Sequence, residues 1–270
     1  MYDEIQQKLA LLGQKKPCST RMSARLKEMD LEDWMFSCLR LAGSDISRES
    51  IRKILREEVV TEVSLAEYQK VYRCAETFKA LQDMKEMHCD LMCGSGIRRL
   101  YQAVFDEEPH YRQSNPVLQK WDYLPPHCRE IKAQMEALYR QAANRDFCRG
   151  QASGALQGAG DGRRACAWGE PPWNPLWQAC LIHMRMLEIY PFGEASEEIS
   201  RYAMLYEMLC VGFPAAAVSM SKQEYDTCIA RYLKTGDLQP FYMSMLRSVY
   251  NKIEVMLQLL ESGREEEEEG

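Results

Sequence analysis

The sequence lacks long apolar runs, an excess of positive charge and a disulfide framework. No stretch approaches the ~20 continuous apolar residues that a membrane-spanning helix requires. The net charge of −6 at pH 7 argues against a protein dedicated to nucleic acids or anionic membranes. The start, Met1-Tyr2-Asp3-Glu4, has neither a basic stretch nor an apolar run, so we expect no secretory signal. These absences predict a cytoplasmic protein with no membrane and no nucleic-acid partner.

The cysteines predict neither disulfides nor a metal centre. Eleven of them are scattered singly along 270 residues, whereas the disulfide frameworks of secreted proteins are short and paired. His88, Cys89 and Cys93 come closest to the spacing of metal ligands. No second pair of cysteine or histidine residues completes a zinc site, so we interpret them as ordinary helix residues.

What the sequence does contain is helical periodicity. A capping box, Ser64 with Glu67, precedes a predicted apolar stripe, and a second box, Ser221 with Glu224, precedes another helix that stops at Thr235-Gly236. The first stripe comprises Leu65, Tyr68, Tyr72, Ala75 and Phe78. The second comprises Tyr225, Ile229 and Leu233, and the last helix carries Phe241, Met245, Val249, Ile253, Met256 and Leu260. The pattern predicts an all-α protein.

Two segments interrupt this pattern. His110 to Tyr123 is the one credible place for extended structure, where Asn115-Pro116 can turn a short hairpin before a helix over 128–142. Residues 144–172 are rich in glycine, and we interpret them as a flexible insertion. Gly158 to Gly162 superficially resembles a phosphate loop, but no strand precedes it and no helix follows it.

From Pro175 the sequence predicts a helix, a kink and a second helix over 196–211. The kink is Ile189-Tyr190-Pro191-Phe192-Gly193, since proline removes a donor and glycine permits unusual dihedral angles. The second helix should bury Ile199, Ala203, Tyr206 and Cys210 and end at Gly212-Phe213-Pro214. The N-terminus of a helix that follows such a turn can bind anions. This kink is therefore the candidate site.

The same region resembles the signature of the Fic (Fido) family. Leu181-Ile182-His183, then Ile189 to Glu194, then Arg201, is similar to the family motif His-Pro-Phe-x-Asp/Glu-Gly-Asn-Gly-Arg-x-x-Arg. Further similar stretches are Tyr111-Arg112, Tyr123 to Pro126, Gly212 to Pro214, Glu224 to Asp226 and Lys234 to Phe241, so that the resemblance covers roughly residues 30 to 260.

The resemblance implies a helical core with one short β-hairpin flap over the site. On this basis we expect an N-terminal helical segment over 1–60 and a Fic-like core over 61–262, with the insertion at 144–172. The glutamate run within 263–270 is interpreted as an acidic, disordered tail.

The departures from the motif concern its chemistry. In working members the motif histidine is the base that activates a target hydroxyl. The matching residue here is Tyr190. A phenol titrates near 10 and is therefore a poor base at neutral pH. The Asp/Glu that holds magnesium is matched by Glu194, and the last arginine by Arg201. Gly-Asn-Gly-Arg becomes Ala195-Ser196-Glu197-Glu198, so that two glutamates make the phosphate site three charge units more negative.

An autoinhibitory helix in many Fic proteins carries Ser/Thr-x-x-x-Glu-Gly/Asn, whose glutamate blocks the site. The best alignment matches Cys38 to its serine, Ala42 to its glutamate and Gly43 to its glycine. The inhibitory glutamate would then be missing as well, which is consistent with the loss of the activity that it controls.

Each surviving site residue also has a structural explanation. Tyr190 is expected to be a buried tyrosine that fills the former histidine space, and His183 a hydrogen-bonded core residue. Glu194 would be a vestigial metal ligand or simply favourable charge in the first turn of a helix, and Arg201 would neutralise nearby carboxylates. Phe192, Ser196, Glu198 and Arg201 occupy vestigial nucleotide-binding positions.

We therefore expect a degenerate Fic-fold protein, without nucleotidyl transfer and without a cofactor, that binds an unidentified protein partner. Self-association stays open. The alternative is a divergent enzyme that uses ATP and magnesium to transfer AMP or another phosphate-containing group to a protein hydroxyl. That enzyme would need a replacement base and a cationic patch, for which Arg112, Arg163 and Arg164 are candidates. A chain with no selected activity is a third alternative.

Overall fold

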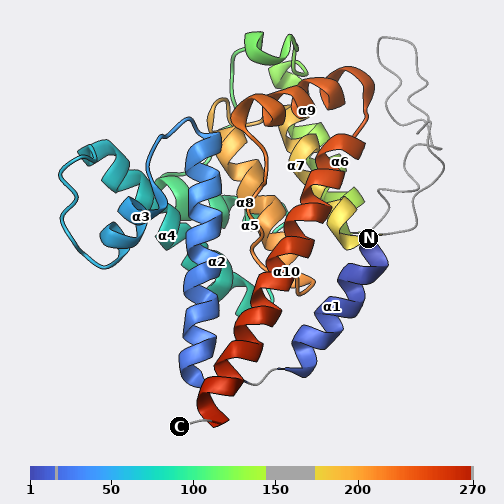
Figure 1. Ribbon diagram of the computed structural model, residues 1–270. Coiled ribbons are helices and arrows are strands. Elements are labelled where there is room, and N and C mark those ends of the chain that lie inside the picture. The colour runs from blue at the N-terminus through green and yellow to red at the C-terminus, as the bar shows by residue number, and fades with distance from the viewer. Residues whose placement is uncertain (16–17, 144–173, 269–270) are drawn as a thin grey trace. The chain divides into compact units, whose positions relative to one another are not determined.

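The computed structural model describes residues 1–15, 18–143 and 174–268, with side chains up to residue 263. In these residues it is all-α, as predicted, with ten α-helices (Figure 1). They are α1 (Tyr2–Gln14), α2 (Thr20–Leu41), α3 (Arg48–Leu55), α4 (Leu65–Glu86), α5 (Gly94–Phe105), α6 (Ile131–Ala143), α7 (Pro175–Ile189), α8 (Ala195–Cys210), α9 (Lys222–Thr235) and α10 (Gln239–Glu268). Two 3-10 helices, η1 (Gln119–Trp121) and η2 (Cys128–Glu130), lie between α5 and α6.

The chain forms two compact units. Unit 1 comprises Met1–Lys79, Met208–Lys222 and Met243–Gly270, and unit 2 comprises Ala80–Glu207 and Gln223–Tyr242. The boundary predicted at residue 60 therefore falls inside unit 1, and α10 continues through the acidic run as far as Glu268. Among the described helices, none has an apolar stretch of the length needed to cross a bilayer.

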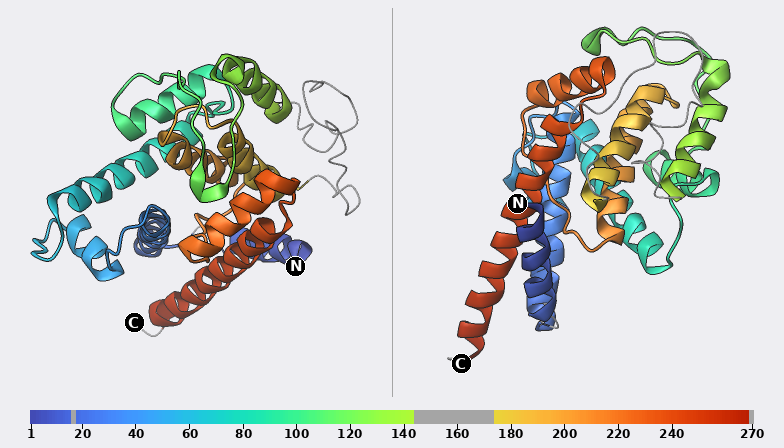
Figure 2. Two further views of the ribbon diagram at one scale, coloured as in Figure 1. Left: turned by 90° about the horizontal axis from the view of Figure 1, so that it is seen from above. Right: turned by 90° about the vertical axis from the view of Figure 1, so that its right-hand side faces the viewer.

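Unit 1 contains helices α1, α2 and α10 (Figures 1 and 2). Ion pairs join α10 to α1 and to α2. Lys252 on α10 is almost completely buried, and its ammonium group lies 3.0 Å from Asp30 and 2.7 Å from Asp33 on α2. Burial of such a charge is tolerated because two carboxylates compensate it. The Lys15–Glu261 pair at 2.6 Å links α10 to the end of α1.

Unit 2 is built around α7, which packs beside α6. Asn174 caps α7, since its side-chain oxygen accepts hydrogen bonds from the amides of Leu176 and Trp177, and Pro175 occupies a first-turn position where no donor is lost. The fully buried side chains of α7 include Leu176, Ala179, Cys180, Ile182, Met184, Met186 and Leu187. Apolar burial all round the helix explains why α7 holds the residues that follow it in a fixed place.

The structure corrects several details of the predicted elements. In α4 Phe78 is buried as predicted, whereas Leu65 and Tyr72 are exposed. The other buried side chains of this helix are Val71, Cys74, Thr77, Leu81 and Met84. Cys210, predicted as buried, is exposed at the end of α8. The glycine-rich insertion predicted at 144–172 lies outside the described residues.

The predicted hairpin takes a different form. Asn115-Pro116 does not turn two strands. Instead one antiparallel bridge joins Leu118 to Tyr123 around η1. The side chain of Asn115 accepts a hydrogen bond of 2.8 Å from the amide of Cys128 and so holds the loop that precedes α6. The chain reverses its direction at η1 instead of at Asn115. We call residues 110–127 the flap.

Candidate functional site

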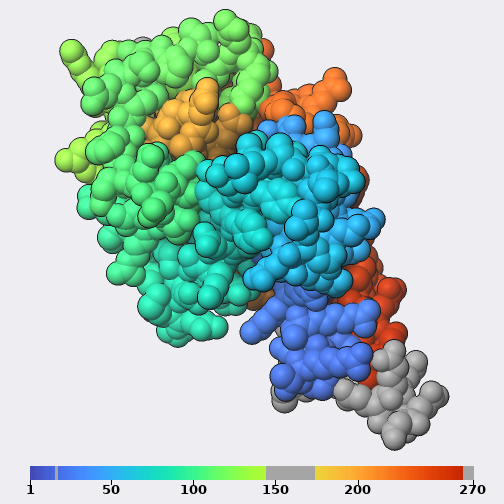
Figure 3. Space-filling view, turned by 90° about the vertical axis from the view of Figure 1, so that its left-hand side faces the viewer, coloured from blue at the N-terminus to red at the C-terminus, as the bar shows by residue number. Residues whose placement is uncertain are grey.

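The candidate site is the turn between α7 and α8. Tyr190 ends α7 in the left-handed conformation (φ 51°, ψ 54°), with its amide donating to the carbonyl of Met186. The turn then runs to Glu194, and the hydroxyl of Ser196 in the first turn of α8 accepts a hydrogen bond of 2.9 Å from the amide of Phe192. Helix, kink and helix are thus placed as predicted. Figure 3 shows part of the α7–α8 segment, in golden orange, reaching the surface between the green segments that precede and form α6.

Arg112 of the flap holds the end of α7. Its Nε donates to the carbonyl of Tyr190 at 2.9 Å, its other guanidinium nitrogens donate to the carbonyls of Ser114 and Pro126, and its backbone amide donates to Pro191. A helix C-terminus leaves carbonyl groups without intrahelical partners, and a cation satisfies them well. Arg112 therefore stabilises the turn, and its guanidinium group is hydrogen bonded to main-chain oxygens.

Tyr190, at the position of the motif histidine, is buried, with 4% of its surface exposed. Its ring makes an edge-to-face contact with Trp121, at 6.3 Å between centroids and 87° between planes. Its hydroxyl donates to Glu197 at 3.5 Å. Burial, together with the negative charges of Glu197 and Glu194, raises the pKa of Tyr190 above its usual value. The phenol stays protonated and acts as a donor.

Glu197, which the sequence resemblance matches to the second motif glycine, faces both the tyrosine and the flap. Its Oε1 forms an ion pair with Lys120, and the Lys120 ammonium group also lies 4.2 Å from the centre of the Trp121 ring. The carboxylate is 21% exposed and the lysine 39% exposed, so the pair is partly screened and contributes little to stability. Its effect is local, because a carboxylate and an ammonium group occupy the space that a glycine would leave open.

The flap is fixed to unit 2 at further points. The Trp121 indole donates to Asp226 of α9 at 3.0 Å, and Lys234 of α9 pairs with Asp122 at 2.9 Å. The Tyr123 hydroxyl donates to the carbonyl of Glu188 at 3.2 Å, in the last turn of α7. These contacts place the flap over the end of α7 and next to Tyr190.

His183 is a core residue, as predicted. It is fully buried, its Nε2 lies 2.9 Å from the Tyr225 hydroxyl, and its ring packs against Tyr225 and Phe241. Burial, with the charge of Arg201, lowers its pKa to about 3. Arg201 itself is 4% exposed on α8. A neutral histidine and a buried arginine therefore lie close together beneath the site.

The other predicted site residues are spread over different environments. Glu194 is exposed, Glu198 is half-buried, and Ser196 is fully buried. Phe192 is nearly buried, and its ring packs between Tyr101 at 5.2 Å and Tyr111 at 5.6 Å. The described residues contain no group of three or more histidine, cysteine, aspartate or glutamate side chains arranged to hold a metal ion.

These residues do not fit a magnesium nucleotide. A phosphate chain needs donors and positive charge at the N-terminus of α8, whereas Glu197 points a carboxylate at the turn and Ser196 already accepts from a turn amide. The cation that could have compensated, Arg112, is bound to carbonyl groups. The other two candidates, Arg163 and Arg164, lie outside the described residues.

Comparison with known proteins identifies the architecture. No protein-family model and no curated protein matches the sequence. Solved structures do match. A Fic domain containing signaling protein from Bacteroides thetaiotaomicron superimposes with a TM-score of 0.72 at 14% identity, over 96% of this chain and 97% of that one. The fold is the Fic fold.

Two other matches agree. A Fic family protein from Desulfovibrio desulfuricans has a TM-score of 0.68 at 14% identity, over 95% of this chain and 74% of that one. Fic-1 from C. elegans has a TM-score of 0.67 at 15% identity, over 96% of this chain and 70% of that one. At these identities the comparison establishes the Fic fold and leaves activity to be argued from the residues.

Two residues important to the site were missed at the sequence level. Lys120 and Trp121 lie on the flap, and they reach Glu197 and Tyr190 across about seventy intervening residues. The available indication was the pair of departures at positions 190 and 197. A tyrosine and a glutamate introduced into a close-packed turn require a donor and a cation nearby.

Proposed function

We propose that this chain is a Fic-fold protein that has lost nucleotidyl transfer and acts by binding a protein partner in the cytoplasm. The observation that supports this most strongly is the contact between Tyr190 and Glu197, which Lys120 completes. It puts a neutral phenol where a base is needed and a carboxylate where phosphate is expected.

The base is the first missing function. A general base must accept a proton near the working pH, and catalysis is efficient when its pKa lies near that pH. The pKa of Tyr190 is raised above the usual value of about 10 by burial and by two glutamates, so the phenolate form is negligible at neutral pH. His183 does not replace it, because it is enclosed by Tyr225 and Phe241 and has no exposed surface.

The anion site is the second missing function. A phosphate at the turn would meet the carboxylate of Glu197 within a partly buried environment, where like charges repel more strongly than in water. Lys120 neutralises that carboxylate only in part, since both groups retain contact with solvent. Glu194 alone, exposed at the turn, provides one carboxylate for a divalent cation.

A binding role is consistent with the flap. Val117 and Leu124 flank the bridge of the flap and leave 65% and 64% of their surfaces exposed. These side chains are available to contact a partner. The net negative charge favours a protein over a nucleic acid as the partner.

The decisive experiment compares the wild-type protein with a variant whose motif is restored. The variant carries Tyr190→His, Ala195→Gly, Ser196→Asn, Glu197→Gly and Glu198→Arg. Both proteins are incubated with magnesium and ATP labelled at the α-phosphate, with a general protein acceptor present, and circular dichroism verifies the fold of each. A second version of the restored variant, with Glu194→Ala, serves as the matched control for metal dependence.

We expect no transfer of label by the wild-type protein and binding of ATP by the restored variant only. Transfer by the wild-type protein, abolished by Tyr190→Phe, would show that the tyrosine takes part in chemistry and would contradict the proposal. Binding of ATP by both proteins with equal affinity would contradict the argument based on Glu197 and Glu198.

A further inference from the structure

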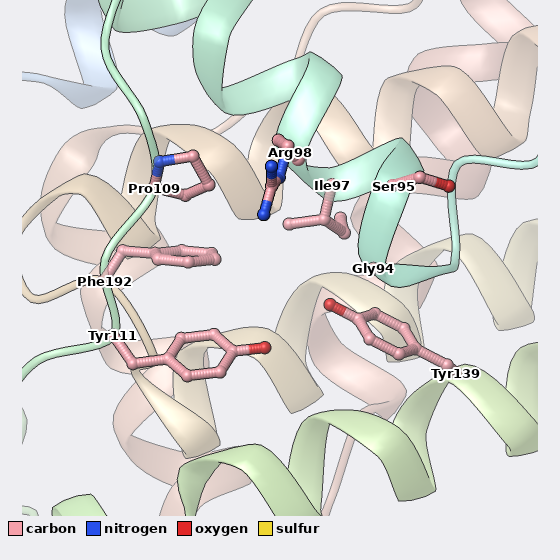
Figure 4. A pocket seen from close by; sticks show the side chains of 8 residues that line it. All are labelled: Gly94, Ser95, Ile97, Arg98, Pro109, Tyr111, Tyr139 and Phe192. Carbon is pink, nitrogen blue, oxygen red and sulfur yellow. The ribbon is translucent and has the colours of Figure 1, made fainter.

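Unit 2 contains a cavity of about 450 Å³ on the side of Phe192 (Figure 4). It is lined by the first turn of α5, by Pro109 just before the flap and Tyr111 at its start, by α6 and by the turn that carries Phe192. Its volume lies within the range of about 300–1,000 Å³ that is usual for sites of small organic ligands.

The walls of the cavity are aromatic and held rigidly. Tyr111 and Phe192 are tilted against each other, at 5.6 Å between ring centroids and 32° between planes. Tyr101 packs against Phe192 as well, at 5.2 Å. Ile97, with 2% of its surface exposed, and Pro109 complete the apolar lining. Rings fixed in this way present an apolar surface that needs no reorganisation when a ligand binds.

Polar groups converge on the same space. Figure 4 shows the Arg98 guanidinium directed into it, and the hydroxyls of Tyr111 and Tyr139 directed toward one another along its edge. Burial raises the pKa of both tyrosines, so both hydroxyls are neutral, and the hydrogen bond between them leaves one phenol proton for a ligand. Arg98 has one ion-pair partner, Glu108, at 3.6 Å, and with side chains 62% and 55% exposed the pair exchanges easily for a ligand.

Together these groups recognise one kind of chemistry. A guanidinium binds a carboxylate through two parallel hydrogen bonds, and phenol hydroxyls add donors to its oxygens. The rings of Tyr111 and Phe192 suit a planar or branched apolar body. The N-terminus of α5 adds partial positive charge on the same side. None of the described residues that line the cavity carries a carboxylate.

We propose that this cavity binds a small carboxylate with an aromatic or branched apolar body, with the anionic end at Arg98. Either a free organic acid or the C-terminal residue of a polypeptide has this chemistry. The ligand would contact Phe192, which belongs to the same turn as Tyr190. This inference does not depend on whether the neighbouring turn binds nucleotides.

The test uses 3-phenylpropanoate as the probe and 3-phenylpropan-1-ol as its neutral counterpart, titrated into the full-length protein by NMR or calorimetry. For the polypeptide arm, a hexapeptide ending in phenylalanine is compared as free acid and as amide. Arg98→Gln removes the proposed anchor, and Arg99→Gln is its matched control, because Arg99 contacts Cys89 and does not line the cavity. Gly94→Leu fills the cavity, since a Cβ at Gly94 meets no atom within 4 Å.

We expect the acid to bind with a Kd on the order of 1 mM or tighter and the alcohol at least about tenfold more weakly. Arg98→Gln should weaken binding about tenfold and Gly94→Leu should abolish it, while Arg99→Gln changes it less than about twofold. Binding of the peptide acid but not of the small acid would identify the occupant as a chain end, and the reverse result would identify a free acid. Equal affinity of the acid and the alcohol, or no binding of any acid, would overturn the proposal.

Discussion

The buried, neutral His183 should make the stability of this protein depend on pH in a defined way. Its pKa is lowered to about 3 in the folded state by burial and by Arg201, whereas in an unfolded chain a histidine titrates near 6.5. As the pH falls from about 6.5 toward 3, the unfolded chain binds a proton that the folded protein does not. The contribution of His183 to stability is therefore intact above about pH 6.5 and decreases progressively below it.

The size of the effect follows from the same two values. Between about pH 7 and about pH 5, the difference in proton binding corresponds to roughly 2 kcal/mol of unfolding free energy. Other groups titrate in this interval too, so the wild-type curve alone does not isolate the effect. The informative quantity is the difference between the wild-type protein and His183→Gln, which retains a polar group for Tyr225 but does not titrate.

The assay is urea unfolding of both proteins at several pH values. The stability advantage of the wild-type protein over His183→Gln should shrink by roughly 2 kcal/mol between about pH 7 and about pH 5. A constant advantage, within about 0.5 kcal/mol, would refute the inference that His183 is held neutral. It would imply that the histidine takes up a proton in the folded protein, near Arg201, as readily as in the unfolded chain.

Three further predictions concern other parts of the structure. Glu207, whose pKa is raised to about 7 by burial and by Asp90, should have the opposite effect to His183. Through Glu207, acidification from about pH 7 to pH 5 should raise the unfolding free energy by roughly 2 kcal/mol. Glu207→Gln should remove this increase, as measured by urea unfolding. Gly96→Ala should destabilise the protein by roughly 2–4 kcal/mol in thermal or urea unfolding, because the added Cβ would lie 2.3 Å from a main-chain oxygen. The matched control is Gly94→Ala, whose Cβ would lie in open space, and this variant should be neutral or slightly stabilising. Lys120→Met should lower the unfolding free energy by no more than about 1 kcal/mol, because the partly exposed pair with Glu197 is screened; a larger loss would contradict that estimate.

The sequence was sufficient to predict the helices that bury a regular apolar face. In α10, the residues from Phe241 to Leu260 recur at helical spacing and are buried as predicted. The kink at Tyr190 to Gly193 was predictable as well, because proline and glycine act on the backbone locally. The capping serine of α4, Ser64, accepts from the amide of Glu67, as its motif indicates.

What the sequence could not predict depended on contacts between distant residues. Leu65 and Tyr72 of α4 were assigned to the core but are exposed. They are as apolar as the residues that are buried, and tertiary packing decides which of these side chains enter the core. The flap adopts a single bridge around η1 because the side chain of Asn115 is used to fix the later loop. Both features depend on tertiary contacts, which the periodicity of the sequence does not reveal.

In the candidate site too, the sequence predicted single positions but not the contacts between them. The sequence identified Tyr190 and Glu197 as departures from the motif, because each is a change at a known position. It did not indicate that the two side chains hydrogen bond to each other, nor that Lys120 joins them. The cavity beside Phe192 was not predicted either, since its lining comes from four separate segments of unit 2.

The central claim, that the turn before α8 no longer accepts a nucleotide, is tested most directly by thermal unfolding of the wild-type protein in millimolar ATP, with and without magnesium. A ligand present at a hundredfold excess over its Kd stabilises the native state by roughly 2.7 kcal/mol, which visibly raises the midpoint. We predict no shift for the wild-type protein and a magnesium-dependent shift for the variant with the restored motif. A magnesium-dependent shift of the wild-type protein would contradict the account and would show that Glu197 and Glu198 do not exclude the nucleotide.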